Sequence, residues 1–157
     1  MIEIKIPGFK KIKISNIILD YNGTLAVDGS PVEGIKERIE ALSKMVNIHV
    51  ITADTNNSVS KHLKNYPCNI KIISGDKQDI KKRDYIRTLG AESSAAFGNG
   101  RNDILMIEEA AVGVAVILDE GCFSSVVLKS DIVVKSINSG LDLFLKTNRL
   151  IAGFRNA

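Results

Sequence analysis

The stretch that decides the fold runs from residue 16 to residue 25 and reads Asn16-Ile17-Ile18-Leu19-Asp20-Tyr21-Asn22-Gly23-Thr24-Leu25. Its three consecutive apolar residues, without polar alternation, predict a strand that is buried on both faces. The apolar run stops at Asp20, and a Gly-Thr turn follows. We therefore expect the Asp20 carboxylate at the exit of a buried strand, where open α/β sheets place their ligands.

Strands and helices alternate along the rest of the chain. Apolar runs predict strands at 46–51, 69–73, 94–97, 112–118 and 131–134. Helical spacing or helix-ending signals predict helices at 32–45, 58–64, 76–89, 102–111 and 140–145. A basic, partly apolar tail follows the last of them. This order predicts an α/β fold with a doubly wound, mostly parallel sheet.

The first fourteen residues follow a different pattern. Isoleucines alternate with charged residues from residue 2 to residue 14, and Pro7-Gly8 interrupts the alternation. A period of two around a Pro-Gly turn predicts a half-exposed β-hairpin. We expect the hairpin to cover an edge of the sheet, with contact to another subunit as the alternative. The expected organisation is a single domain, 1–157, with a hairpin appendage at 1–15 and a core at 16–157.

Composition narrows the class of protein. The 157 residues are 45% hydrophobic and 25% charged with a net charge of +3, which is typical of a soluble globular protein and not of a disordered one. No apolar run approaches the roughly 18 residues of a membrane span, and the N-terminus lacks a signal peptide's apolar core, so we expect a cytoplasmic protein without a membrane partner. The short lysine runs at 10–13 and 81–83 do not predict nucleic-acid binding. Cys68 and Cys122 are expected to be buried free thiols.

Polar groups follow three of the predicted strands. Asp20 ends the first, Thr52 follows the second, and Gly98-Asn99 follows the fourth. The carboxyl ends of parallel strands share one edge of a sheet, so these groups are expected to meet there. The strand-to-helix linker before residue 85 is rich in lysine and supplies candidate cations for the same edge.

Helical geometry selects one of these lysines. The predicted buried stripe of the helix at 76–89 contains Tyr85, Ile86 and Leu89. Counting back three, four and seven positions leads to Lys82, whose side chain therefore projects from the inward face. Lys77 and Lys81 are expected to be solvated helix charges.

The loop Gly98-Asn99-Gly100-Arg101-Asn102-Asp103 allows two interpretations. It follows a strand and begins a helix, as a dinucleotide-binding G-x-G-x-x-G loop does, but the third glycine of that pattern is Asp103 here. A carboxylate at that position would repel a pyrophosphate. It is suited instead to holding Mg²⁺, and Asn99 offers a neutral oxygen to the same ion.

These motifs resemble those of the haloacid dehalogenase (HAD) superfamily. Asp20 to Leu25 looks like its DxDGT(L/V) signature, and the order of Asp20, Thr52, a lysine and an acidic loop matches over most of the chain. Two positions depart from the pattern, because Asn22 and Asn99 stand where phosphatases of the superfamily carry aspartate. Within the superfamily, the chain looks most like soluble proteins similar to the phosphorylation domain of P-type cation-transport ATPases.

The resemblance implies a role for each motif. It implies that Asp20 attacks phosphorus to form an aspartyl-phosphate and that Mg²⁺ is the cofactor. The implied catalytic residues are Asp20, Asn22, Thr52 and Lys82. The implied phosphate-binding residues are Tyr21, Gly23, Thr52, Ala53 and Lys82, and the implied metal ligands are Asp20, the backbone carbonyl of Asn22, Asn99 and Asp103.

The intervals between the motifs leave no room for the cap domain that the superfamily usually inserts. An uncapped site is open, so a phosphorylated small molecule in a site covered by a neighbouring subunit, or a bulky substrate, is expected. The sequence favours a Mg²⁺-dependent phosphatase that is slow because Asn22 replaces an acid/base residue. A non-catalytic or regulatory binding module derived from such enzymes is the alternative. A receiver domain phosphorylated by a kinase is disfavoured, because Ile18 and Leu19 precede Asp20 where receivers need an acidic pair.

Overall fold

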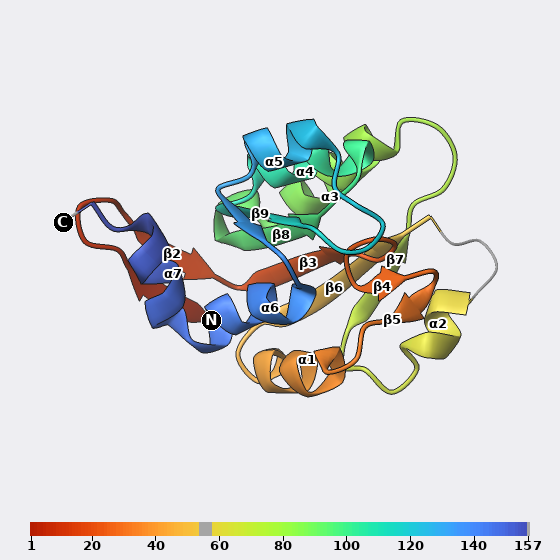
Figure 1. The fold of residues 1–157 in the computed structure, drawn as a ribbon, viewed down its shortest axis with the longest axis horizontal. Helices are drawn as coiled ribbons and strands as arrows, with labels where there is room; N and C mark the ends of the chain where they lie inside the picture. The colour runs from red at the N-terminus through yellow and green to blue at the C-terminus, as the bar shows by residue number, and fades with distance from the viewer. Residues whose placement is uncertain (54–57, 157) are drawn as a thin grey trace.

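A six-stranded parallel sheet forms the centre of the protein in the computed structural model, which describes residues 1–53 and 58–156 (Figure 1). The strands are β3 (Asn16–Asp20), β6 (Asn47–Thr52), β7 (Asn69–Ile72), β8 (Ser94–Gly98), β9 (Val112–Val116) and β10 (Ile132–Val134). Their order is β10-β9-β8-β3-β6-β7. The chain builds outward from β3 to β7 and then returns to the other side of β3, which confirms the predicted α/β class and doubly wound topology.

Helices cover both faces of this sheet. One face packs against α1 (Ile35–Ser43) and α6 (Ile137–Leu145), and the other against α3 (Gln78–Leu89), α4 (Ile104–Glu109) and α5 (Ser124–Lys129). The side chains of Ile17 and Leu19 lie in the first core, and Ile18 lies in the second. Successive strand residues point to opposite faces, so an apolar run is required wherever both faces are covered.

The N-terminal segment forms the predicted hairpin from β1 (Ile2–Lys5) and β2 (Lys11–Ile14). The expectation that it covers a sheet edge is wrong, because β7 and β10 are the edge strands and the hairpin pairs with neither. Only Ser15 separates β2 from β3, so the hairpin extends beyond the amino end of β3. Its apolar face is covered by α7 (Thr147–Phe154), with the rings of Phe9 and Phe154 6.0 Å apart.

Several short elements were not expected from the sequence. They are the two-stranded hairpin β4 (Ala26–Val27) and β5 (Ser30–Pro31), the helices α5 and α7, and the 3-10 turns η1 (Ala91–Ser93) and η2 (Arg101–Asp103). The basic tail is helical because Leu150 is buried and Ile151 and Phe154 pack against the core. The helix α2 (Ser58–His62) follows β6 and the segment 54–57, which lies outside the described residues.

The described residues between Asp20 and Lys82 form strands and helices of the core and the small β4–β5 hairpin, with no cap domain among them. None of the helices in the described ranges is both long and apolar enough to span a membrane.

Candidate active site

The carboxyl ends of three neighbouring strands bring the predicted polar groups together. The central strand β3 lies between β6 and β8, with Asp20 opposite Ile51 and Leu19 opposite Phe97. Asp20, Thr52 and Gly98 therefore end at one edge of the sheet. The side chains of Asp20 and Thr52 are buried, and that of Asn99 is partly buried at the same edge.

The turn after Asp20 depends on a glycine for a steric reason. Gly23 has a φ of 77°, and its N–H donates to the carbonyl of Ala26 at 2.8 Å. A Cβ atom at this position would lie 2.2 Å from Nδ2 of Asn99, which is closer than any real contact. The positive φ and the approach of Asn99 together require glycine, and they place the turn directly against the loop of residues 98–103.

Lys82 lies at the centre of the site, as the helical stripe predicts. Its side chain is 3% exposed, and its Nζ donates to Oδ1 of Asp20 at 2.7 Å and to Oδ1 of Asp103 at 2.6 Å. Lys77 and Lys81 are exposed, and Nζ of Lys81 donates instead to the carbonyl of Ser74. One buried ammonium therefore serves two buried carboxylates.

This arrangement perturbs the ionisation of Asp20. Burial, and then the negative charge of Asp103, raise the pKa of Asp20 to about 7, although the ion pair with Lys82 opposes them. Burial tends to lower the pKa of Lys82, but the two carboxylates outweigh it and raise the pKa. With both carboxylates ionised, the trio carries a net charge of −1 and attracts a further cation.

The two carboxylates are held differently. Oδ2 of Asp103 accepts the backbone N–H groups of Asn99 at 3.0 Å and Gly100 at 2.9 Å, so both oxygens of this fully buried side chain have donors. The hydroxyl of Thr24 lies at the long distance of 3.4 Å from Oδ2 of Asp20, and a backbone hydrogen bond from Tyr21 also favours the ionised form of the carboxylate. Asp20 therefore presents the more available oxygen to a ligand, whereas Asp103 holds Lys82 and the loop in place.

Thr24 connects the first motif to the acidic loop. Its hydroxyl lies 3.1 Å from Oδ1 of Asn99 and 3.4 Å from Oδ2 of Asp20, so those two oxygens converge on one point. The amide nitrogen of Asn99 donates to the carbonyl of Gly121 at 3.1 Å, which directs Oδ1 toward the site. The sequence placed Thr24 only in the turn after Asp20, and no local pattern shows a contact across 75 residues.

The oxygen donors at this point fit a hard cation. Two carboxylates, the Asn99 carbonyl oxygen and the Asn22 backbone lie at the same edge, and Mg²⁺ is commonly held by one or two protein carboxylates, with water and phosphate oxygens completing its shell. No cluster of three or more histidine, cysteine or acidic residues suited to a metal occurs within the described ranges. The oxygen atoms of Asp20, Asn22 and Asn99 fit Mg²⁺, whose shell is commonly completed by water and phosphate oxygens.

The predicted phosphate-binding groups differ in availability. The backbone N–H of Tyr21 donates to the carbonyl of Ile51 at 3.1 Å, and that of Gly23 is already bonded to Ala26, so either could contact phosphate only after its bond opened. Asn22 and Ala53 are exposed beside the buried Thr52.

Tyr21 also links the turn to two other elements, which the sequence did not indicate. Its buried hydroxyl donates to the carbonyl of Gly29 in the β4–β5 hairpin at 3.0 Å. The same hydroxyl shares a hydrogen bond of 3.0 Å with Nδ1 of His62 in α2. The residue next to Asp20 therefore joins the turn after β3 to the β4–β5 hairpin and to α2.

Solved structures share this fold. The chain aligns with 3-deoxy-D-manno-octulosonate 8-phosphate phosphatase from Moraxella catarrhalis, solved with magnesium, phosphate and KDO, with a TM-score of 0.71 and 19% identity over 90% of this chain and 94% of that one. The cobalt-bound phosphatase YrbI from Haemophilus influenzae gives 0.70 and 16%, covering 90% and 93%. A Legionella pneumophila protein assigned to subfamily III A of the HAD hydrolases gives 0.68 and 17%, covering 89% and 86%. The chain therefore has the fold of these phosphatases and of the HAD superfamily hydrolase.

Sequence relatives place the chain more narrowly. It is 49% identical over 39 residues to the uncharacterized protein MJ0072 of Methanocaldococcus jannaschii, which is 25% of this chain and 89% of that protein. It is 54% identical over 61 residues to MJ0073 of the same organism, covering 39% of this chain and 66% of that protein. The chain belongs to the family of MJ0072, and no protein-family model matches it. The narrower resemblance to P-type ATPase domains stays a prediction.

Proposed function

We propose that the protein is a Mg²⁺-dependent phosphatase that works through an aspartyl-phosphate on Asp20. The observation that carries the proposal is the buried trio of Asp20, Lys82 and Asp103 at the carboxyl end of the central strand. The phosphatases that share the fold support the same class of reaction. A phosphorylated small molecule or a bulky substrate, a second subunit over the open site and a cytoplasmic location are part of this proposal.

In the first step, transfer of the phosphoryl group to Asp20, residues of this chain have separate roles. Oδ2 of Asp20 forms the new bond to phosphorus, while the bond to the leaving oxygen breaks and its electron pair stays with that oxygen. Lys82 is bonded to Oδ1, so it orients the carboxylate and neutralises charge on the phosphoryl group. The hydroxyl of Thr52 would donate to a phosphoryl oxygen.

Mg²⁺ would be held directly by Asp20, the Asn22 carbonyl and Asn99, and by Asp103 through a water molecule, and it would neutralise the phosphoryl oxygens. Asn99 contributes no charge, so the protein groups around the ion carry less negative charge than an all-aspartate site. Weak binding of Mg²⁺ in the absence of phosphate is the expected consequence.

Because residue 22 is an asparagine, the second step, hydrolysis of the aspartyl-phosphate, is the slower one. An amide neither protonates a leaving group nor activates water at neutral pH, and losing a positioned acid/base group costs about 10²–10⁴ in rate. Attack by Asp20 needs no base because its ionised form is already nucleophilic. Esters with good leaving groups should therefore phosphorylate Asp20 faster than water removes the phosphate, and the intermediate accumulates.

The two amides also favour the alternative of a non-catalytic or regulatory module, and one experiment separates the two functions. The purified protein is mixed with p-nitrophenyl phosphate and Mg²⁺, and nitrophenol release is followed from the first milliseconds. A burst followed by a slow steady phase, both lost with EDTA and in Asp20→Asn, is the result expected of the enzyme. Absence of turnover together with absence of a BeF₃⁻ adduct on Asp20 would favour the binding module.

A further inference from the structure

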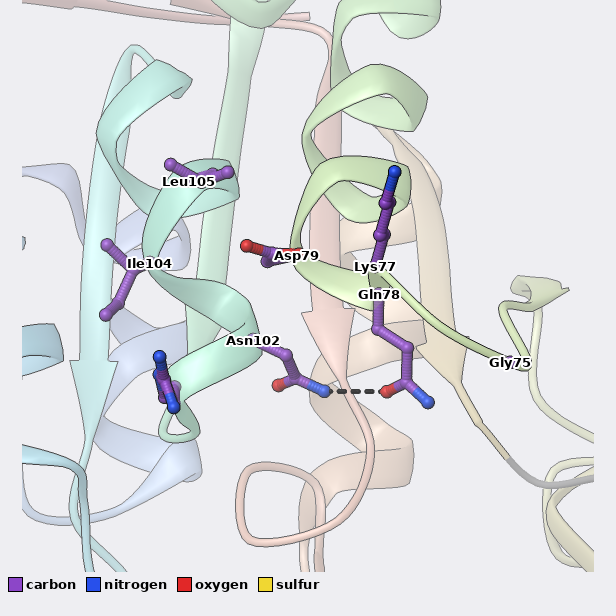
Figure 2. Close-up of a pocket in the computed structure, with 8 residues that line it drawn as sticks. Gly75, Lys77, Gln78, Asp79, Asn102, Ile104 and Leu105 are labelled. Carbon is purple, nitrogen blue, oxygen red and sulfur yellow. Dashed lines mark hydrogen bonds between the residues drawn. The ribbon is translucent and has the colours of Figure 1, made fainter.

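A cleft opens beside the trio, between the start of α3 and the loop that leads into α4 (Figure 2). Its volume is about 770 Å³. It is lined on the α3 side by Gly75, Lys77, Gln78 and Asp79, and on the α4 side by Arg101, Asn102, Ile104 and Leu105. The volume is sufficient for a small organic molecule.

A pair of amides joins the cleft to the catalytic lysine. Nδ2 of Asn102 donates to Oε1 of Gln78 at 2.9 Å, and Figure 2 shows this bond across one end of the cleft. Oδ1 of the same Asn102 lies 3.4 Å from Nζ of Lys82, which itself is bonded to Asp20. Asn102 therefore lines the cleft and also contacts the lysine of the trio.

The rim of the cleft carries cations without carboxylate partners. Lys77 and Arg101 line it and are exposed, and neither forms an ion pair within the described part of the chain. In contrast, Arg83 and Arg87 of α3 are paired with Asp84 and Glu109. The charged residues among those that line the cleft are Lys77, Arg101 and Asp79, so the lining carries a net charge of +1.

Lys77 also holds a conformation that lysine disfavours. Its φ is 56° and its ψ is 43°, in the left-handed region that glycine and asparagine occupy most easily. The other residue of this kind, Asp28, precedes Gly29 in the β4–β5 turn, where Asp-Gly is favoured. Lys77 is followed by Gln78 and not by glycine, so a favoured Asp-Gly type of turn does not account for its positive φ. This is consistent with a role for its charge.

We propose that this cleft binds the leaving group of the phosphate ester and that the leaving group carries a second anionic group, a carboxylate or another phosphate, neutralised by Lys77 and Arg101. This inference rests on the proposed phosphatase function. Asp79, Gln78 and Asn102 provide acceptors and donors for hydroxyl groups, and Ile104 and Leu105 provide the apolar wall.

The test compares esters that differ only in the second charge. In 3-phosphoglycerate a carboxylate replaces the terminal alcohol of glycerol 3-phosphate, and fructose 1,6-bisphosphate adds a phosphate to fructose 6-phosphate. In one of the two pairs, we expect kcat/KM to be at least about tenfold higher for the ester that carries the second anionic group. The pair that shows this preference identifies the group as a carboxylate or a phosphate. Lys77→Asn, which suits the left-handed backbone, and Arg101→Gln should each reduce that preference at least about threefold, whereas Arg83→Gln should not.

Equal kcat/KM within both pairs, or a preference unchanged in both cleft variants, would overturn the inference while leaving the phosphatase intact. Absence of turnover with every ester would instead reject the proposed function. In that case calorimetric titration of the wild type and of the Lys77→Asn, Arg101→Gln double variant with 3-phosphoglycerate and with fructose 1,6-bisphosphate tests the cleft directly. Binding that the double variant loses supports an anion site, and equal or absent binding overturns it.

Discussion

Replacing Asp20 with asparagine should stabilise the metal-free protein. Asp20 is 8% exposed, and burial together with Asp103 raises its pKa from an ordinary 3.8 to about 7. A carboxyl group with a higher pKa in the folded state binds its proton more tightly there than in the unfolded chain. The stability it contributes is therefore present at low pH and is lost as the pH rises from about 4 through 7.

The size of the effect follows from the pKa. A difference between 3.8 and about 7 corresponds to an upper limit of about 4 kcal/mol at pH 8. Asp20→Asn removes the buried charge, and the amide oxygen can still accept a hydrogen bond from Lys82, which keeps its ion pair with Asp103. We expect the variant to be about 2–4 kcal/mol more stable at pH 8, which raises Tm by about 4–16 °C in a chain of this length.

The assay is denaturant unfolding of both proteins in EDTA between pH 4 and pH 8.5. The difference in unfolding free energy should be near zero at pH 4, grow up to pH 7 and then level off. Asp103→Asn is the matched control and should have the opposite sign, with a loss of about 2–4 kcal/mol, because the three N–H donors of Asp103 then face an amide with one acceptor oxygen. An Asp20→Asn variant less stable than the wild type at pH 8 would show that the ion pair outweighs desolvation and would refute the reasoning.

Three further predictions concern the same site. Lys82→Ala should lower kcat at least about a hundredfold, whereas Lys81→Ala, whose Nζ is bonded to Ser74, should change it less than about threefold; equal losses would contradict the geometry. Asn22→Asp should speed the steady phase of p-nitrophenyl phosphate hydrolysis at least tenfold at saturating Mg²⁺, and a slower variant would mean that another group transfers the proton. Titration with Mg²⁺ should raise the Tm of the wild type and leave that of Asp20→Asn almost unchanged, because Asp20 is an expected ligand.

The sequence alone determined those features that depend on local periodicity. The run Ile17-Ile18-Leu19 indicated a strand covered on both faces, since neighbouring strand residues point in opposite directions and all three had to be buried. The same logic, with the helical period, selected Lys82 over Lys77 and Lys81. The order of strands and helices gave the doubly wound sheet because connections between parallel strands are short and right-handed.

Only the tertiary structure decided the contacts between distant segments. The bond between Asp103 and Lys82, the approach of Thr24 to Asn99 and the link from Tyr21 to His62 join residues that are 21, 75 and 41 positions apart. The packing of α7 against the β1–β2 hairpin is also a contact between segments that are far apart in the sequence. Periodicity shows which face of an element is buried and not which element covers it, so the charge balance around Asp20 and the cleft beside it required the folded chain.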